Sequence, residues 1–283
     1  MIAASDYVVV VFAYNRSEKT RRTLHSIQRA ITFQQSLDPS AQPPHVIAAI
    51  DGPKSNSKDR ALVDEVADVF RAEMPHAEIR RGLSNRSLPA HLTSTLDDIF
   101  STPGTRFLIC IEDDVEISPT LIAALLHASE RVGREGYVIG AAPAHRDGSL
   151  EHQALGLDRV AHKASSDLLK TYMQEFSLDG AQREGAYGAR DHDAINRWSR
   201  EIALRAGVRP PEGTSQDRIR ELAWRSSGVQ LVGLPMRLVK HRGYWGQHNT
   251  PWYALRTGQL FQRLDRRPWA EIAREITALL QKR

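Results

Sequence analysis

The feature that most constrains the fold is an alternation of two hydrophobic periods in the first half of the chain. Short apolar or β-branched runs occur at 7–14, 45–51, 77–81, 106–112 and 137–142. Stretches of helical length and pattern separate them, at 17–33, 58–73, 88–101 and 118–133. Strands that alternate with helices are typical of βαβ units, in which helices cover both faces of a sheet. The sequence therefore predicts an α/β fold with a mostly parallel sheet flanked by helices.

The second half is less regular. Residues 143–166 are rich in His, Gly and charge and predict a long loop, whereas 209–217 predicts a surface excursion or linker. Strand-like composition returns at 228–241. In the fourth helical stretch, Ser118 is expected to be the N-cap and Pro119 to occupy the first turn.

Composition and charge narrow the class of protein. Hydrophobic residues make up 41% and charged residues 25% of the chain, no apolar run reaches 18 residues, and Cys110 is the single cysteine. No basic segment or cleavage site precedes the first apolar run, so we expect a cytoplasmic protein without a secretory signal. The net charge of +4 is too small to indicate a nucleic-acid partner.

The excess positive charge lies in the last 30 residues. Residues 254–283 contain seven Arg or Lys and three Asp or Glu. Their net charge of +4 equals the net charge of the whole chain. Five apolar side chains of this segment recur at helical spacing: Trp269, Ile272, Ile276, Leu279 and Leu280. This stripe predicts packing against the rest of the protein, with peripheral contact to an anionic membrane surface as the alternative.

Polar side chains follow three of the predicted strands: Asn15 and Arg16 the first, Asp51 the second, and the acidic triplet Glu112–Asp113–Asp114 the fourth. Open α/β sheets bind ligands at the carboxyl ends of their strands. No glycine-rich phosphate loop follows any strand. A divalent cation, Mn²⁺ or Mg²⁺, held by carboxylates could therefore bind a diphosphate here. Alternatively, Asp113 and Asp114 cap the next helix or pair with basic residues.

These residues resemble a known family. The acidic triplet at a strand end is similar to the metal-binding DxD motif of GT-A glycosyltransferases, and most of all to the EDD triplet of N-acetylglucosaminyltransferase I. "AYNRSEKTRRTL", the aspartate that ends "AAID", and "LPAHLTSTLDDIF" before "FLICIEDD" agree in order, over residues 7–130. The resemblance implies a GT-A fold, a nucleotide-sugar donor, most simply a UDP-sugar, and an acceptor with a hydroxyl group.

The resemblance also implies roles for the residues at the strand ends. Arg16, with Asn15 beside it, would lie near the donor phosphates, and Asp51 would contact the uracil. Asp114 would bind the metal ion, whereas Glu112 and Asp113 would face the ribose or the donor sugar. For Arg16 and Asp51, a surface arginine and a turn aspartate are the alternatives.

The second half would supply the acceptor site and a general base. "GAYGARDHDAINRW" resembles a segment of β-1,4-galactosyltransferases, which implies that Asp191 is the base and Asp193 a substrate ligand. Arg190 replaces the glutamate of that family, and both aspartates could instead cap a helix. "VGLPMRLVKH" resembles the galactosyltransferase segment that places a histidine on the metal, so His241 is the first choice and His248 the second. N-acetylglucosaminyltransferase I lacks this histidine.

We therefore predict one GT-A domain over residues 1–283. Its parts would be a nucleotide-sugar-binding half (1–142), an acceptor and catalytic half (143–253) and a basic C-terminal helix (254–283). The expected activity is metal-dependent glycosyl transfer, inverting by analogy. The alternatives are a sugar nucleotidyltransferase, a metal-dependent phosphohydrolase and a non-catalytic nucleotide- or carbohydrate-binding protein.

Overall fold

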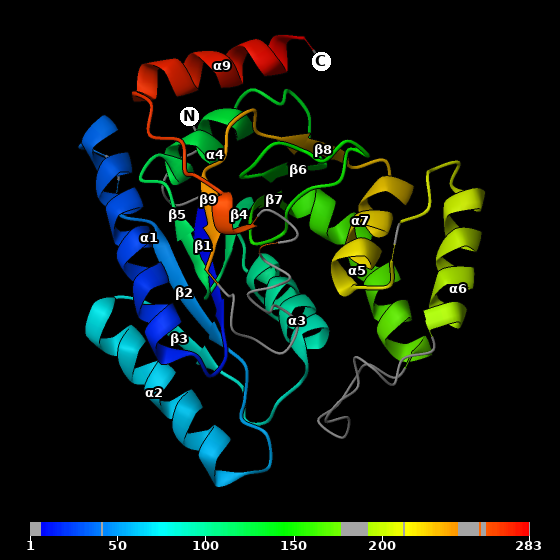
Figure 1. The fold of residues 1–283 in the computed structure, drawn as a ribbon, viewed down its shortest axis with the longest axis horizontal. Helices are drawn as coiled ribbons and strands as arrows, with labels where there is room; N and C mark the ends of the chain where they lie inside the picture. Colours follow the sequence, from blue (N-terminus) through cyan, green and yellow to red (C-terminus); the bar gives the residue numbers. More distant parts are fainter. Residues whose placement is uncertain are drawn as a thin grey trace.

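The computed structural model describes residues 7–40, 42–176, 192–211, 213–242, 255 and 259–282. Its centre is a seven-stranded sheet with the strand order β3-β2-β1-β4-β7-β6-β8 (Figure 1). The strands are β1 (Tyr7–Ala13), β2 (His45–Ile50), β3 (Glu78–Arg81), β4 (Phe107–Glu112), β6 (Tyr137–Gly140), β7 (Ala154–Asp158) and β8 (Gln230–Gly233). Only β7 runs antiparallel to its neighbours. The predicted α/β fold with a mostly parallel sheet is confirmed.

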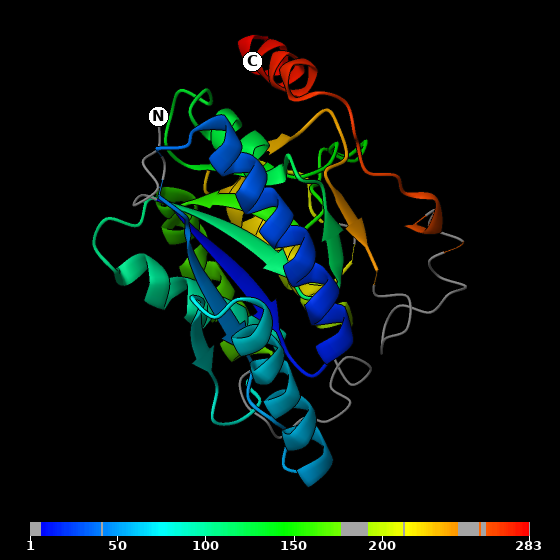
Figure 2. The same cartoon turned by 90° about the vertical axis from the view of Figure 1, so that its left-hand side faces the viewer.

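Helices cover both faces of this sheet, and Figure 2 shows the layers from the side. One face carries α1 (Ser17–Leu37), α2 (Ser57–Glu73), α4 (Leu121–Ser129) and α9 (Trp269–Gln281). The other carries α3 (Leu88–Ser101), α5 (Arg159–Glu175) and α7 (Gln216–Ser226), and α6 (His192–Arg205) packs on α7. In β1, Val9 and Val11 face the first layer whereas Val8 and Val10 face the second. Burial on both faces explains why this strand is apolar throughout.

The predicted loop at 143–166 is wrong, because this segment contains β7 and the start of α5. Asp158 accepts a hydrogen bond from Ala161 N at 2.6 Å and thereby caps α5. Gly156 lies against the ring of Phe107, where a Cβ atom would come within 2.3 Å of the ring. The strand is short and carries no β-branched residue, so composition alone does not indicate it.

The other local predictions fare differently. The predicted surface excursion or linker at 209–217 holds for its described residues up to Ser215, which caps α7, and only the last two residues belong to the helix. Helix α4 begins at Leu121 with Thr120 as its N-cap, and Ser118 does not cap it. The reason is that 115–117 forms an extra strand, β5 (Val115–Ile117), which pairs with β9 (Val239–His241).

The C-terminal helix packs against the protein through its apolar stripe. Ile272 and Ile276 are fully buried. The ring of Trp269 makes edge contacts with Phe33 on α1 and His127 on α4. The packing interpretation of this stripe is thus confirmed, and the apolar face is not free for a membrane surface. None of the helices in the described ranges is long and apolar enough to cross a membrane.

Candidate functional site

The acidic triplet lies at the carboxyl end of β4, in the middle of the sheet. Phe12 of β1 pairs with Glu112, so the segments that follow these two parallel strands run side by side. Arg16 binds both aspartates of the triplet. Its guanidinium donates to Asp114 Oδ2 at 2.6 Å and to Asp113 Oδ1. The structure thus shows the pairing with a basic residue that the sequence left open, and neither aspartate caps α4.

Asp113 connects the triplet to the start of α1. Its carboxylate accepts hydrogen bonds from Tyr14 N at 3.3 Å and from the Thr20 hydroxyl at 3.4 Å, and its backbone oxygen accepts one from the Thr23 hydroxyl at 2.9 Å. The side chain is 1% exposed. Burial raises its pKa, and the nearby charge of Arg16 opposes that effect. Asp113 therefore fixes the loop after β1 in place beneath the site.

Asp114 meets His241 through the β5–β9 pair. Val115 pairs with His241, and Asp114 O accepts a hydrogen bond from Arg242 N at 2.7 Å. These contacts place His241 Nε2 3.4 Å from Asp114 Oδ2. Burial alone would raise the pKa of Asp114, but His241 and Arg16 outweigh it and hold the pKa at about 2. Its second oxygen, Oδ1, is buried and has no hydrogen-bond partner among the described residues.

These residues fit a divalent cation that arrives with a phosphate ligand. Within the described ranges, no cluster of three His, Cys, Asp or Glu side chains could hold a metal ion alone. Asp114 Oδ1 and His241 offer two ligands. Mg²⁺ and similar ions commonly take one or two protein ligands and complete their shell with phosphate oxygens and water. The unpartnered Oδ1 is the atom that such an ion would satisfy.

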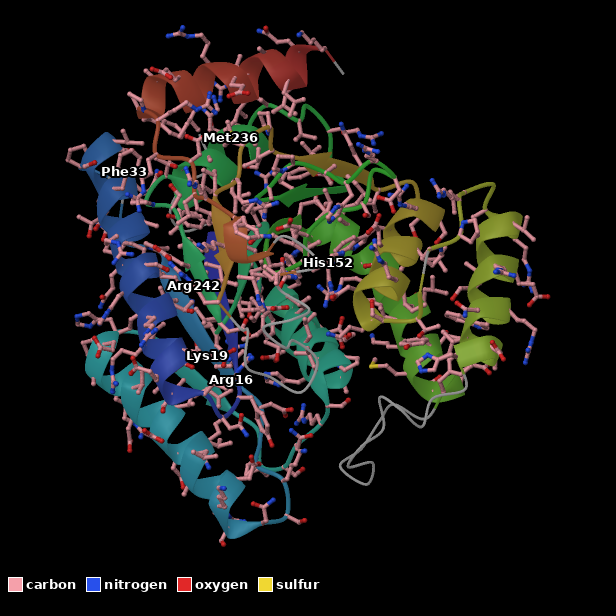
Figure 3. All side chains as sticks on the ribbon, in the orientation of Figure 1. Arg16, Lys19, Phe33, His152, Met236 and Arg242 are labelled. Atoms are coloured by element: carbon pink, nitrogen blue, oxygen red, sulfur yellow. The ribbon has the colours of Figure 1, made fainter. Side chains whose placement is uncertain are left out.

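Two basic side chains lie close to Asp114. Arg16 binds it directly, and the charge of Asp114 acts on Lys19; Figure 3 labels both, together with Arg242. Burial and the charge of Arg16 lower the pKa of Lys19. Arg242 Nε donates to Glu116 at 2.9 Å across the β5–β9 pair. Glu116 thus has Arg242 as its own basic partner. This pairing argues against Glu116 as a metal ligand.

Asp51 follows β2, at the same edge of the sheet as the acidic triplet. Its carboxylate accepts hydrogen bonds from Gly52 N at 2.8 Å, Asn85 Nδ2 at 2.9 Å and Arg86 N at 3.1 Å. The side chain is therefore fixed before any ligand binds. Burial raises its pKa, and the charge of His91 opposes that effect.

Asn15 points away from the acidic triplet. Its Nδ2 donates to Asp59 Oδ1 on α2 at 2.8 Å, and Tyr14 and Lys54 also donate to the Asp59 carboxylate. Asp59 thereby ties the loop after β1 to the loop after β2. Asp59 was not predicted, because no sequence pattern distinguishes it from other acidic residues in a first helical turn.

Glu112, the first residue of the triplet, belongs to a second cluster of polar side chains together with Asp217 and His152. Burial, with the charges of Asp114 and Asp217, raises the pKa of Glu112 to about 8. Asp217 lies in the first turn of α7, and His152 Nδ1 is 3.7 Å from its Oδ1. Sequence reasoning missed both residues because it placed them in a loop and a linker. The only local signal is Ser215, whose side chain caps α7 by accepting from Arg218 N.

Three predicted residues remain: Asp191, Asp193 and His248. Asp191 and His248 lie outside the described residues. Asp193 is exposed in the first turn of α6, which packs on α7 far from α1 in Figure 1. The structure therefore leaves the base and the second histidine as predictions from the resemblance.

No protein-family model and no curated protein matches the sequence. Among solved structures, 4-diphosphocytidyl-2C-methyl-D-erythritol synthase from Anaerococcus prevotii is similar over 92% of this chain and 100% of its own, with 10% identity and a TM-score of 0.44. TarS from S. aureus is similar over 52% of this chain and 23% of its own, with 15% identity and a TM-score of 0.33. The longer of the two matches is to the synthase. Because both TM-scores are below 0.5, the proposal below rests on the residues of this chain.

Proposed function

We propose that the protein is a metal-dependent glycosyltransferase that uses a nucleotide-sugar donor, most simply a UDP-sugar, and an acceptor hydroxyl. The observation that carries this proposal is the buried, unpartnered Oδ1 of Asp114 beside His241 and Arg16. A carboxylate that is kept ionised, a histidine and an arginine at one strand end match the needs of a cation and a diphosphate.

The reaction divides between two parts of the site. Bound at Asp114 and His241, Mn²⁺ or Mg²⁺ would act as a Lewis acid for the leaving diphosphate. Arg16 can release one carboxylate and donate to a phosphate oxygen, while Asp51 faces the base of the nucleotide. The acceptor oxygen forms its bond to the anomeric carbon as the bond to the diphosphate breaks, and a general base takes the hydroxyl proton.

Two residues are candidates for that base. The resemblance favours Asp191. The described structure supports Asp217, which lies at a helix N-terminus close enough to Glu112 to raise its pKa. The Asp217 side chain is 38% exposed, so a substrate hydroxyl can reach it.

The test is ligand-dependent thermal stabilisation. UDP with Mn²⁺ is expected to raise the melting temperature of the wild type, and Asp114→Ala is expected to abolish the increase. Glu116→Gln is the matched control, because Glu116 is two residues away and pairs with Arg242. The proposal fails if no combination of nucleotide and metal stabilises the wild type, or if Asp114→Ala responds like the control.

The nucleotidyltransferase alternative uses the same carboxylates but a different second substrate. It would release pyrophosphate from a nucleoside triphosphate and a phosphorylated acceptor. A glycosyltransferase would release a nucleoside diphosphate from a nucleotide sugar. Parallel assays of both products across uridine, cytidine, guanosine and thymidine nucleotides decide between them. A phosphohydrolase would release phosphate without any acceptor, and a binding protein would show stabilisation without turnover.

A further inference from the structure

A buried histidine, His152, lies near the acidic triplet. His152 precedes β7, and its neighbour Gln153 accepts a hydrogen bond from Glu112 N at 3.0 Å. The His152 side chain is 6% exposed. Its ring stacks on Trp224 of α7, with 5.4 Å between ring centroids and 10° between planes. Stacking and burial fix the ring in one plane between the sheet and α7.

The two ring nitrogens point at two carboxylates of α7. Nδ1 is 3.7 Å from Asp217 Oδ1, and Nε2 is 3.7 Å from Glu221 Oε2. Neither nitrogen has a hydrogen-bond partner within the described part of the chain, and Glu221 Oε2 has none either. A buried polar atom without a partner destabilises the folded state. A displacement of less than about 1 Å would bring both pairs within hydrogen-bond distance.

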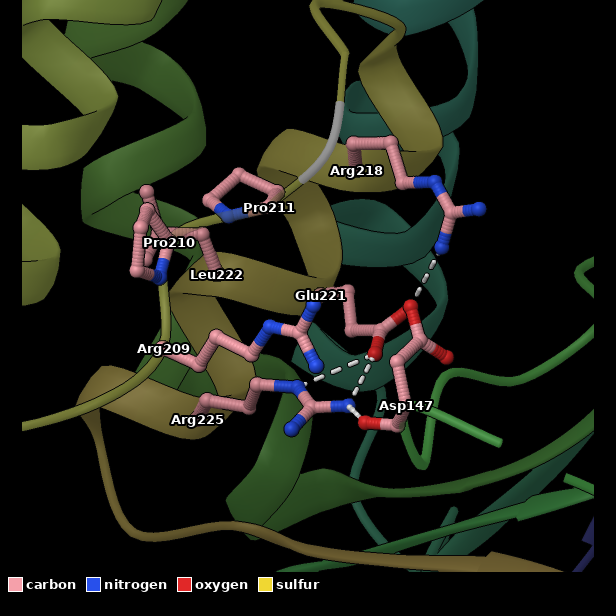
Figure 4. Close-up of a pocket in the computed structure, with 8 residues that line it drawn as sticks. All are labelled: Asp147, Arg209, Pro210, Pro211, Arg218, Glu221, Leu222 and Arg225. Atoms are coloured by element: carbon pink, nitrogen blue, oxygen red, sulfur yellow. Dashed lines mark hydrogen bonds and ion pairs between the residues drawn. The ribbon is translucent and has the colours of Figure 1, made fainter. Parts of the chain in front are cut away.

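Glu221 is the fixed end of this arrangement. Its other oxygen, Oε1, accepts from Arg225 Nε at 3.0 Å and from the Arg225 Nη2 at 2.6 Å, and Arg218 lies 3.7 Å from Oε2 (Figure 4). Burial raises the pKa of Glu221, but His152 and Arg225 outweigh it and lower the pKa. Glu221 is therefore an ionised carboxylate that Arg225 holds in place.

Asp217 is the exposed end of this arrangement. Its side chain is 38% exposed, and His152 provides its ion-pair contact. Among the described residues, Asp217 and Glu221 of α7 are the charged groups paired with His152, and Arg220 lies over the Trp224 ring at 5.8 Å. From β4, Glu112 lies close enough to Asp217 for the charge of Asp217 to contribute to its raised pKa.

We propose that His152 is a positioning residue for Asp217. It bridges Asp217 to the fixed carboxylate of Glu221 and so holds Asp217 as an oriented carboxylate toward the donor site. The inference rests on the proposed function and on Asp217 as the base. An imidazole can donate to two carboxylates only when both of its nitrogens carry a proton, so a closed bridge requires a doubly protonated ring.

The bridge has a defined part in the reaction. While the acceptor oxygen bonds to the anomeric carbon and the diphosphate leaves with the electron pair of the broken bond, the hydroxyl proton passes to Asp217. His152 keeps Asp217 within reach of that proton but exchanges no atom with the substrate. A displacement of the base by 1 Å can reduce a rate by about 100-fold.

The kinetic test compares His152→Gln with His162→Gln. His162 is also a buried histidine beside an aspartate, 2.8 Å from Asp97, but it lies between α3 and α5. With UDP release from a UDP-sugar as the assay, His152→Gln is expected to lower kcat by about 10- to 100-fold. KM for the donor and the stabilisation by UDP and Mn²⁺ should not change. In the Asp217→Asn background, His152→Gln should have no further effect. A further loss in that background, or an unchanged kcat, overturns the proposal.

A second measurement does not need turnover. In ¹⁵N NMR spectra of labelled protein at neutral pH, the wild-type His152 ring is expected to show two protonated nitrogens, and Asp217→Asn and Glu221→Gln to show one. A ring with one proton in the wild type overturns the bridge, whatever the protein catalyses. If the bridge is present but no nucleotide sugar turns over, the proposed function fails and the contact remains.

Discussion

The loop after β2 provides a sharp test of how the site is built, through Gly52→Ala. A Cβ atom on Gly52 would lie 2.4 Å from the backbone N, C and O atoms of Ser84. Real Cβ contacts do not come below 3.0 Å, so the backbone must move by at least 0.6 Å. The contact is with backbone, and no flexible side chain can turn away to relieve it. Ser84 is exposed, so its loop is expected to move outward.

The consequence for Asp51 follows from its hydrogen bonds. Two of its three partners, Asn85 and Arg86, belong to the displaced loop. Asn85 N also donates to Pro53 O at 3.1 Å. Overpacking of this kind costs about 1–3 kcal/mol. Each hydrogen bond that is lost adds about 0.5–1.5 kcal/mol. We expect Gly52→Ala to lower the free energy of unfolding by about 2–6 kcal/mol and to weaken UDP binding as strongly as Asp51→Asn does.

The assays are urea denaturation followed by circular dichroism and calorimetric titration with UDP and Mn²⁺. Gly140→Ala is the control, because its Cβ would meet only the Leu150 side chain, at 3.2 Å. That side chain can shift by a few tenths of an ångström, so the control should lose less stability and keep its UDP affinity. The reasoning is refuted if Gly52→Ala is as stable as the control and binds UDP like the wild type.

Three further outcomes are expected. Cys110 is buried, which raises the pKa of its thiol to about 12. A thiol reagent should therefore react only as fast as the protein unfolds. Rapid labelling of the native protein would contradict this. Burial and the charges of Asp114 and Asp217 raise the pKa of Glu112 from 4.5 to about 8. The folded state then binds more protons than the unfolded state between these values, so the stability of the metal-free protein should fall as the pH rises from 4.5 to 8. Glu112→Gln should flatten that slope in urea titrations at pH 5 and pH 8, and an unchanged slope would count against the assignment. Ile276 is fully buried, so Ile276→Ala should cost about 2–5 kcal/mol and Ile276→Val about 0.5–1.5 kcal/mol; equal, small losses would mean that α9 is not packed in solution.

Part of the site follows directly from the first half of the sequence. Strand and helix periods there fixed the boundaries of β1, β2 and β4 to within a residue or two, because these strands are buried on both faces. Parallel strands place their carboxyl ends at one edge of a sheet. Arg16, Asp51 and the acidic triplet could therefore be assigned to one edge without coordinates.

The sequence alone did not show which charges compensate one another there. The contacts of Asp114 with Arg16 and His241 join segments that are far apart in the chain, and they depend on the short β5–β9 pair. Three residues are too few to leave a periodic signal. The sequence could suggest His241 only through a resemblance.

The sequence by itself determined the strands of the first half, the helices between them and the strand ends where charge collects. Local patterns carry this information, since burial on a strand or a helix repeats every few residues. Only the tertiary structure decided that Asp113 is buried and binds the loop after β1, and that Asp114 keeps one oxygen without a hydrogen-bond partner among the described residues. The same holds for the position of His152 between Asp217 and Glu221. Those facts depend on distances between residues whose separation in the chain exceeds any local period, and tertiary packing alone sets them.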